Sequence, residues 1–232
     1  MLIKKTSANI SKISDLTKTC KELELTLSEP IDFIAGNFVN IFLDINGEKV
    51  RRAYSISSSD KHNQSISIAI RLKPDGKVTP IFWNEVLLNT KIEVMGPLGI
   101  NTADKMTHPK VFLFAYGVGA GVVKSIADHL TNTKDLVELI IMTGSRFEDE
   151  IIYKDYFDQL TETNPKVKVF HIVSRPQENS IFKKGYIQDY ITDLDFNNSD
   201  VYICGQKSAC DQLAEAIKKT QPSDCAFFVE AF

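Results

Sequence analysis

The apolar run at residues 111–116 constrains the fold of this chain more than any other feature. Its side chains, Val, Phe, Leu, Phe, Ala and Tyr, show no alternation with polar residues, which is typical of a strand buried on both faces of a parallel sheet. A glycine-rich turn and a helix ending near residue 130 follow. Strands and helices then alternate, which predicts a parallel sheet covered by helices. The expected strands are 137–142, 167–173, 201–204 and 226–229, and the expected helices are 149–160 and 208–219.

The first hundred residues show a different pattern, that of half-buried antiparallel strands. Strands are expected at 22–27, 38–43, 51–59, 65–72 and 91–95, because apolar and polar side chains alternate there or strand formers dominate. Thr79 and Pro80 are expected to start a short helix, with Thr79 as its N-cap. We therefore predict a two-domain α+β chain. Its parts are an antiparallel β-barrel at residues 1–104 and an α/β parallel-sheet domain at residues 105–232.

The composition narrows the class of protein. The chain has 232 residues, 43% of them hydrophobic and 25% charged, as in soluble globular domains. Neither a membrane-spanning run nor the apolar core of a signal peptide is present, so we expect a cytoplasmic protein without a membrane partner. A net charge of −3 argues against nucleic-acid binding. The four cysteines and four histidines lack metal-ligand spacing, so neither a metal site nor an iron–sulfur cluster is expected.

A cation, an aromatic ring and a run of hydroxyls share the expected strand at residues 51–59. Arginine matches phosphate oxygens, the Tyr54 ring offers a face for stacking, and the serines supply donors and acceptors for ring heteroatoms. This combination suits a ligand that has both a diphosphate and a flat ring. By itself, the pattern also fits an exposed edge strand with a basic start.

Glycines 117, 119 and 121 stand between the buried strand and the next helix. Such a turn lets backbone amides approach a pyrophosphate at the helix N-terminus. The spacing is not Gly-x-Gly-x-x-Gly, and the following strand runs into Gly144-Ser145-Arg146 rather than into an acidic residue that would hold a ribose. A tight strand-to-helix turn without a ligand is the alternative interpretation.

Several motifs occur in the order found in the ferredoxin–NADP reductase family, and the chain resembles a member along essentially its whole length. That resemblance implies an FAD-binding antiparallel barrel joined to an NAD(P)-binding parallel-sheet domain. The motifs are Arg52-Ala53-Tyr54-Ser55, Gly76-Lys77-Val78-Thr79, the Gly-Pro-Leu-Gly turn at 96–99, the glycine turn at 117–121, and Tyr202-Ile203-Cys204-Gly205.

The resemblance also implies individual roles. Arg52 resembles the arginine on the FAD diphosphate, Tyr54 the tyrosine beside the flavin and Ser55 the serine near its N5 atom, while Thr79 stands where the family usually has a serine facing the diphosphate. The implied catalytic residues are Ser55, Cys204, Glu230 and Phe232. The implied cofactor-binding residues are Arg52, Ala53, Tyr54, Ser55, Ile68, Ala69, Ile70, Arg71, Gly76, Lys77, Val78, Thr79, Gly117, Val118, Gly119, Ser174, Arg175, Tyr186, Cys204, Gly205 and Phe232.

The last five residues resemble the plant-type ending, in which an aromatic ring covers the flavin until nicotinamide displaces it. Phe232 matches that ring, and Glu230 matches a glutamate that helps to close the site. A hydrophobic plug and a solvated charge are the alternative interpretations. Cys204 is similar to the cysteine beside the nicotinamide; the alternative is a buried small hydrophobe, and a nucleophile is not expected because no histidine partner is indicated.

The dinucleotide is expected to be NADPH rather than NADH. Ser174-Arg175 and Tyr186 resemble the 2′-phosphate pocket of plant-type reductases, with Arg175 as the main cation and Tyr186 stacked on adenine; a basic, solvated loop is the alternative. Arg71 resembles an arginine that contacts the dinucleotide from the barrel side. The chain departs from the family at Val118 for threonine, Val122 for proline and Gln206 for proline, all on the nicotinamide side.

The expected activity is that of a ferredoxin– or flavodoxin–NAD(P)+ reductase. Such an enzyme exchanges a hydride between NADPH and FAD, and single electrons between the flavin and a separate carrier such as ferredoxin or flavodoxin. Two alternatives stay open. One is a flavin reductase or the reductase component of an oxygenase; the other is a flavoprotein electron-transfer subunit that no longer binds NAD(P)H.

Overall fold

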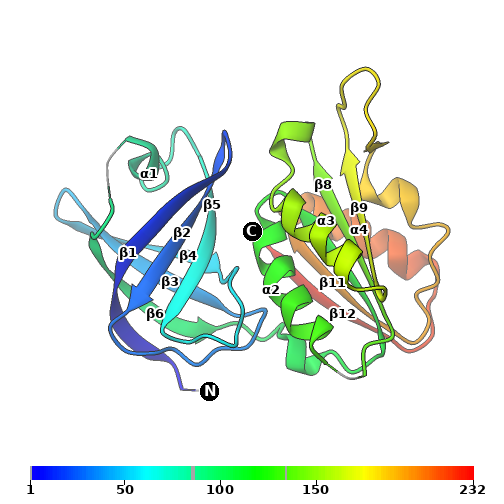
Figure 1. The fold of residues 1–232 in the computed structure, drawn as a ribbon, viewed down its shortest axis with the longest axis horizontal. Helices are drawn as coiled ribbons and strands as arrows, with labels where there is room; N and C mark the ends of the chain where they lie inside the picture. The colour runs from blue at the N-terminus through cyan, green and yellow to red at the C-terminus, as the bar shows by residue number, and fades with distance from the viewer. Residues whose placement is uncertain (1, 85–86, 134) are drawn as a thin grey trace.

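A computed structural model describes residues 2–84, 87–133 and 135–232 of the chain. It contains two six-stranded sheets that follow one another in the sequence. Figure 1 shows them side by side, with the C-terminus between them. A short 3-10 helix, Ala103–Lys105, lies in the connection. Within the described ranges, none of the helices combines the length and the apolar character needed to cross a bilayer.

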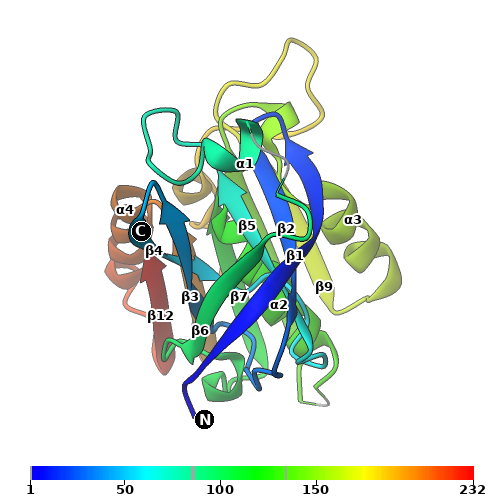
Figure 2. The ribbon, with the colours of Figure 1, turned by 90° about the vertical axis from the view of Figure 1, so that its left-hand side faces the viewer.

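The first sheet is antiparallel throughout and has the strand order β4-β3-β6-β1-β2-β5. The sheet is strongly curled (Figure 2). Ile56, directly after the edge strand β4, forms an isolated bridge with Ile68 of the other edge strand, β5. The prediction of an antiparallel barrel is confirmed. Its strands are β1 (Lys4–Thr17), β2 (Cys20–Leu27), β3 (Phe38–Ile45), β4 (Glu48–Ser55), β5 (Ser65–Arg71) and β6 (Lys91–Leu98).

Three local expectations for the barrel differ from the structure. Strand β1, which is 14 residues long, is absent from the expected strands, because its pattern is mostly polar. The expected strand at 51–59 ends at Ser55. The short helix α1 spans Ile81–Asn84, and Thr79 does not cap it: the Thr79 hydroxyl accepts a hydrogen bond from the Lys73 amide at 2.8 Å and donates to the Lys73 carbonyl at 3.2 Å.

The second sheet is parallel throughout and has the strand order β10-β9-β8-β7-β11-β12. The predicted parallel sheet with helices is confirmed. Its strands are β7 (Lys110–Tyr116), β8 (Glu138–Ser145), β9 (Val167–Val173), β10 (Lys183–Lys184), β11 (Ser199–Gly205) and β12 (Cys225–Ala231). Its helices are α2 (Gly119–Thr131), α3 (Lys154–Thr163), α4 (Lys207–Lys219) and the 3-10 turns η2 (Glu148–Glu150) and η3 (Ile187–Tyr190).

The apolar run at the centre of this sheet serves both of its faces. Val111, Leu113 and Ala115 pack with α2 and α3, whereas Phe112 and Phe114 pack with α4 and η3. The expected helix at 149–160 is divided by Tyr153, whose φ of 57° is left-handed. Strands β8, β9 and β10 follow one another on one side of β7. The chain then crosses back, and β11 and β12 lie on the other side of β7. Ligands of such sheets bind outside the carboxyl ends of the strands at this reversal.

Candidate functional site

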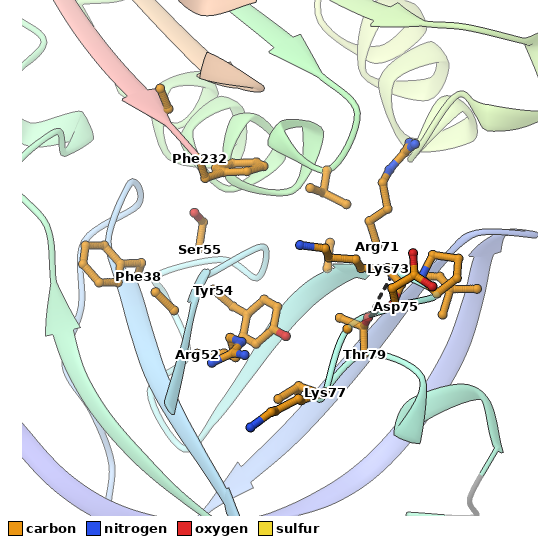
Figure 3. A pocket seen from close by; sticks show the side chains of 18 of the residues that line it. Phe38, Arg52, Tyr54, Ser55, Arg71, Lys73, Asp75, Lys77, Thr79 and Phe232 are labelled. Carbon is orange, nitrogen blue, oxygen red and sulfur yellow. Dashed lines mark hydrogen bonds between the residues drawn. The ribbon is translucent and has the colours of Figure 1, made fainter. Parts of the chain in front are cut away.

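A cavity of about 1130 Å³ lies where β4 and β5 separate beyond their bridge. Its floor comes from the barrel, and Phe232 lies opposite, on the parallel-sheet half (Figure 3). Val118, Glu230 and Ala231 line it from the same half. The barrel residues that line it are Phe38, Arg52, Ala53, Tyr54, Ser55, Ala69, Arg71, Leu72, Lys73, Pro74, Asp75, Gly76, Lys77, Val78 and Thr79.

The charges and rings of this cavity suit an anionic ligand with a flat ring. Arg52, Lys73 and Lys77 lie on the barrel side around Tyr54, while Phe232 lies across the opening near Ser55 (Figure 3). Among the described residues, Arg52 donates only to the Arg51 carbonyl, at 2.7 Å, which leaves the other donors of its guanidinium group available for a phosphate. Burial raises the pKa of Tyr54 to about 12, so its hydroxyl, already uncharged at neutral pH, keeps its proton at alkaline pH as well.

A half-buried carboxylate, that of Glu230, joins the two halves at the cavity. Glu230 on β12 accepts hydrogen bonds from the Ser55 hydroxyl of β4 and from the Tyr202 hydroxyl of β11, the latter at 2.9 Å. Burial raises the pKa of Glu230, and the two hydroxyl donors offset part of that rise. The arrangement can hold or pass a proton at Ser55 Oγ, at the surface of the cavity.

The stability of the Glu230→Gln variant is expected to increase relative to that of the wild type as pH rises. The folded protein holds the Glu230 proton more tightly than the unfolded chain does, because the folded pKa lies above the ordinary value of 4.5. The stability given by the protonated carboxyl is therefore fully present below that value and is lost as pH rises through the raised pKa. Glutamine cannot ionise, so the variant escapes this loss.

Thermal denaturation between pH 5 and pH 8 measures the effect as the difference in Tm between variant and wild type. Glu215→Gln, which changes an exposed carboxylate on α4, is the control. A difference for Glu230→Gln that does not change with pH would contradict the expectation.

The carboxyl ends of β7 and β11 adjoin the cavity. A Cβ on Gly119 would lie 2.4 Å from the Cys204 carbonyl oxygen, so only glycine lets the start of α2 approach β11 this closely. Gly205, the last residue of β11, has a φ of 142°, which also favours glycine at this edge. The Arg71 side chain extends from the barrel to this edge. The Nη2 atom of Arg71 lies 3.3 Å from the position that a Cβ on Gly117 would take. A cation and a close-approach turn therefore meet at the switch point of the sheet.

A second basic edge lies at the ends of β8 and β9. The amides of Ser174 and Arg175 donate to the carbonyls of Ser145 and Arg146, at 3.0 and 2.9 Å, so the exposed side chains of Arg146 and Arg175 leave adjacent backbone segments. Tyr186 is 60% exposed nearby in sequence. Sequence reasoning did not assign Arg146 a role, although it follows a buried strand in the same way as Arg175 does.

The structure brings most of the expected barrel residues to the cavity, but not all. The side chains of Ile68 and Ile70 pack inside the barrel core. Cys204 is fully buried, and burial raises the pKa of its thiol well above the ordinary value, as for a small hydrophobe. Gly117, Gly119 and Gly205 flank the cavity at the sheet edge, and Ser174, Arg175 and Tyr186 stand apart from its lining.

Several lining residues were missed, and part of the serine run was misinterpreted. Phe38 and Lys73 line the cavity; the only signals were the start of a strand and a polar turn. Of the serines at 55–59, only Ser55 lines it. Among the residues that the structure describes, no group of three or more His, Cys, Asp and Glu side chains is placed to hold a metal ion.

Comparisons with known proteins cover both halves. Family models described as "Oxidoreductase FAD-binding domain" and "Oxidoreductase NAD-binding domain" match residues 7–102 and 113–216. "Protein RfbI" of Salmonella typhimurium is 28% identical over 87% of this chain and 60% of its own length. The "Phenol hydroxylase P5 protein" of Acinetobacter pittii is 23% identical over 100% of this chain and 66% of its own length. The chain thus spans less than two thirds of either relative.

Solved structures have the same fold. The Amycolatopsis cytochrome P450 reductase GcoB superposes with a TM-score of 0.88 at 19% identity, covering 98% of this chain and 70% of that one. A ferredoxin NADP+ reductase from Neisseria gonorrhoeae with bound FAD and NADP superposes with a TM-score of 0.83 at 14% identity, covering 98% of both chains. At these identities the likeness shows the fold alone.

Proposed function

The chain belongs to the ferredoxin reductase-like family of FAD- and NAD(P)-binding oxidoreductases, and from this premise we propose that it passes electrons between NADPH and a separate one-electron carrier such as ferredoxin or flavodoxin. Bound FAD supplies the chemistry, because a flavin exchanges two electrons with a nicotinamide and one at a time with a carrier. The protein's task is to hold both ring systems and to exclude water.

The observation that carries the proposal is a cavity lined from both halves of the chain. Arg52 and Lys77 offer cations for a diphosphate, and Tyr54 offers an uncharged ring face beside them. Ser55, Glu230 and Phe232 close the opposite side. We place FAD here, with Ser55 and Glu230 at the end where a proton is held and Phe232 over the ring. The volume of about 1130 Å³ is slightly above the roughly 300–1,000 Å³ typical of ligand sites, which favours a large ligand.

We place the dinucleotide substrate along the carboxyl ends of the parallel strands. The glycine turn at Gly119 and the Arg71 guanidinium, which lies against Gly117, suit its pyrophosphate. Arg175 and Arg146 would take a 2′-phosphate, and Tyr186 an adenine ring; this assignment favours NADPH over NADH. We also place the domain boundary near residue 105, in the connection between the two sheets.

Anaerobic stopped-flow reduction of the FAD-loaded protein tests the proposal. Rapid bleaching of the flavin by NADPH, followed by reoxidation with purified ferredoxin or flavodoxin, is the expected result. No bleaching with either NADPH or NADH would instead favour an electron-transfer subunit that no longer binds NAD(P)H. Bleaching without carrier turnover would favour a flavin reductase or an oxygenase reductase component. The latter is supported as the second candidate by the likeness to the "Phenol 2-monooxygenase, reductase component DmpP" of Pseudomonas sp., which is 23% identical over 96% of this chain and 64% of its own length.

Phe232→Ala is expected to tighten nicotinamide binding and to alter the flavin absorption spectrum. Phe232 lines the cavity and is 60% exposed, so little packing is lost from the core. Aromatic stacking contributes about 0.5–1.5 kcal/mol beyond burial, which corresponds to roughly a two- to tenfold change in affinity.

Dinucleotide titrations that follow the flavin absorption bands measure both effects. The control is Phe42→Ala, because the Phe42 ring lies beneath Lys5 and Lys49 and outside the cavity lining. If Phe232→Ala matched the wild-type spectrum and affinity, the ring would have to lie away from the flavin.

A further inference from the structure

The serines at 57–59, which follow β4, lie outside the cavity lining and form hydrogen bonds with helix α2 of the other half. Ser125 Oγ donates to the Ser58 carbonyl at 2.7 Å, and Lys124 Nζ donates to the Ser57 carbonyl at 3.0 Å. Ser59 Oγ donates to Asp128 Oδ2 at 2.6 Å. These contacts join the segment 57–60 to α2, and we call them, with the Asp60–His129 contact described next, the domain clamp.

The clamp uses one face of α2 and is anchored at both ends. Lys124, Ser125, Asp128 and His129 are spaced at i, i+1, i+4 and i+5, so they share one side of the helix. His129 Nδ1 lies 2.6 Å from Asp60 Oδ2, and the same Asp60 oxygen accepts the Ala35 amide at 3.1 Å. The segment 57–60 is thereby fixed to the barrel as well as to the helix.

A second set of contacts holds the start of α3 against the barrel, next to the domain clamp. Glu22 Oε1 on β2 accepts hydrogen bonds from the Ser57 hydroxyl at 3.1 Å and from the Tyr153 hydroxyl at 2.7 Å. Tyr153 has a left-handed φ of 57°, a conformation that is unfavourable for a bulky residue and persists where surrounding contacts enforce it. Lys124 Nζ lies 5.4 Å from the centre of the Tyr153 ring.

The contact between the two halves, rather than a pyrophosphate, explains why residue 121 is a glycine. A Cβ on Gly121 would lie 3.2 Å from the Cβ atoms of both Ser57 and Ala69. Glycine therefore lets α2 lie directly on the barrel wall. The third glycine of the turn serves contact between the two halves.

In both segments the clamp follows shortly after a residue that lines the cavity. Ser57 follows Ser55 by two positions, and α2 begins one residue after Val118; Ser55 and Val118 both line the cavity. We propose that the domain clamp is a positioning device that sets the separation of the flavin and nicotinamide rings. This inference rests on the proposed function. Because hydride exchange depends on close alignment, a small shift of α2 should slow flavin reduction without weakening either cofactor.

The test compares Ser59→Ala, Gly121→Ala and the double variant Ser125→Ala/Asp128→Ala with the wild type. Anaerobic stopped-flow titration with NADPH gives the limiting rate of flavin reduction and the dissociation constant separately. We expect the limiting rate of the double variant to fall by about tenfold or more, with unchanged FAD affinity and dinucleotide dissociation constant. Asp128→Asn keeps an oxygen acceptor for Ser59 and should stay close to the wild-type rate. Ser11→Ala, which removes an exposed hydroxyl that donates to the Glu24 carbonyl within the barrel, is the control.

Hydrogen–deuterium exchange gives a readout that does not depend on activity. Peptides that cover residues 57–60 and α2 should exchange faster in the double variant and in Ser59→Ala. Wild-type protein that is not reduced by NADPH or NADH would overturn the proposed function and this inference together. Reduction of the wild type, with equal limiting rates or unchanged exchange in the variants, would overturn the inference alone.

Discussion

Arg52→Ala is expected to weaken FAD binding at least tenfold. Arg52 lines the cavity, and its only hydrogen bond among the described residues is the one from Nη1 to the Arg51 carbonyl, so its remaining donors face the place proposed for the diphosphate. Each charge-assisted hydrogen bond to a phosphate is worth about 1.5–3 kcal/mol, and 1.4 kcal/mol is about tenfold in affinity. Equilibrium titration of the apoprotein with FAD measures the loss.

The neighbouring residue provides a matched control. Arg51 carries the same charge on the same strand but alternates to the opposite face, and it is not part of the cavity lining. Arg51→Ala should therefore bind FAD nearly as tightly as the wild type. The placement of FAD between β4 and β5 would be wrong if the two alanine variants lost affinity equally, or if Arg52→Ala retained the wild-type dissociation constant.

Arg175→Ala is expected to lower kcat/KM for NADPH about tenfold or more, with little change for NADH, since one charge-assisted phosphate contact is worth about 1.5–3 kcal/mol. The structure adds a second expectation. Because Arg146 leaves the backbone segment to which the Arg175 amide is bonded, Arg146→Ala should reduce the NADPH preference in the same direction. A 2′-phosphate shared by two arginines would explain why neither β8 nor β9 ends in an acidic residue.

Steady-state kinetics with both dinucleotides, in the presence of a dye acceptor, measure this discrimination. Lys168→Ala is the control, because Lys168 lies in β9 and forms an ion pair with Glu138 on β8, at 2.7 Å. The assignment of NADPH is falsified if wild-type enzyme uses NADH equally well at low concentration. Equal losses for both dinucleotides in Arg175→Ala would place Arg175 away from the 2′-phosphate.

The sequence alone determined the two halves and their order. Hydrophobic periodicity is local, so the unbroken run at 111–116 was enough to place a strand buried on both faces, and β9 was predicted with the bounds that the structure has. The motif around Arg52 and Tyr54 could also be recognised from the sequence, because its residues are contiguous in one short strand. Strand β1 was not readable, since polar side chains cover most of its length and pairing with β2 and β6 holds it in place.

Only the tertiary structure decided what each polar residue does. Ser55 and Glu230 are separated by 175 positions in the sequence. No local pattern shows that the carboxylate on β12 accepts a hydrogen bond from a hydroxyl on β4. The serines after Ser55 look equivalent to it in the sequence, yet the Ser57 and Ser58 carbonyls and the Ser59 hydroxyl form hydrogen bonds with α2. Gly121 belongs to the contact between the two halves for the same reason: the space around a residue is set by segments far away in the chain, which local periodicity does not describe.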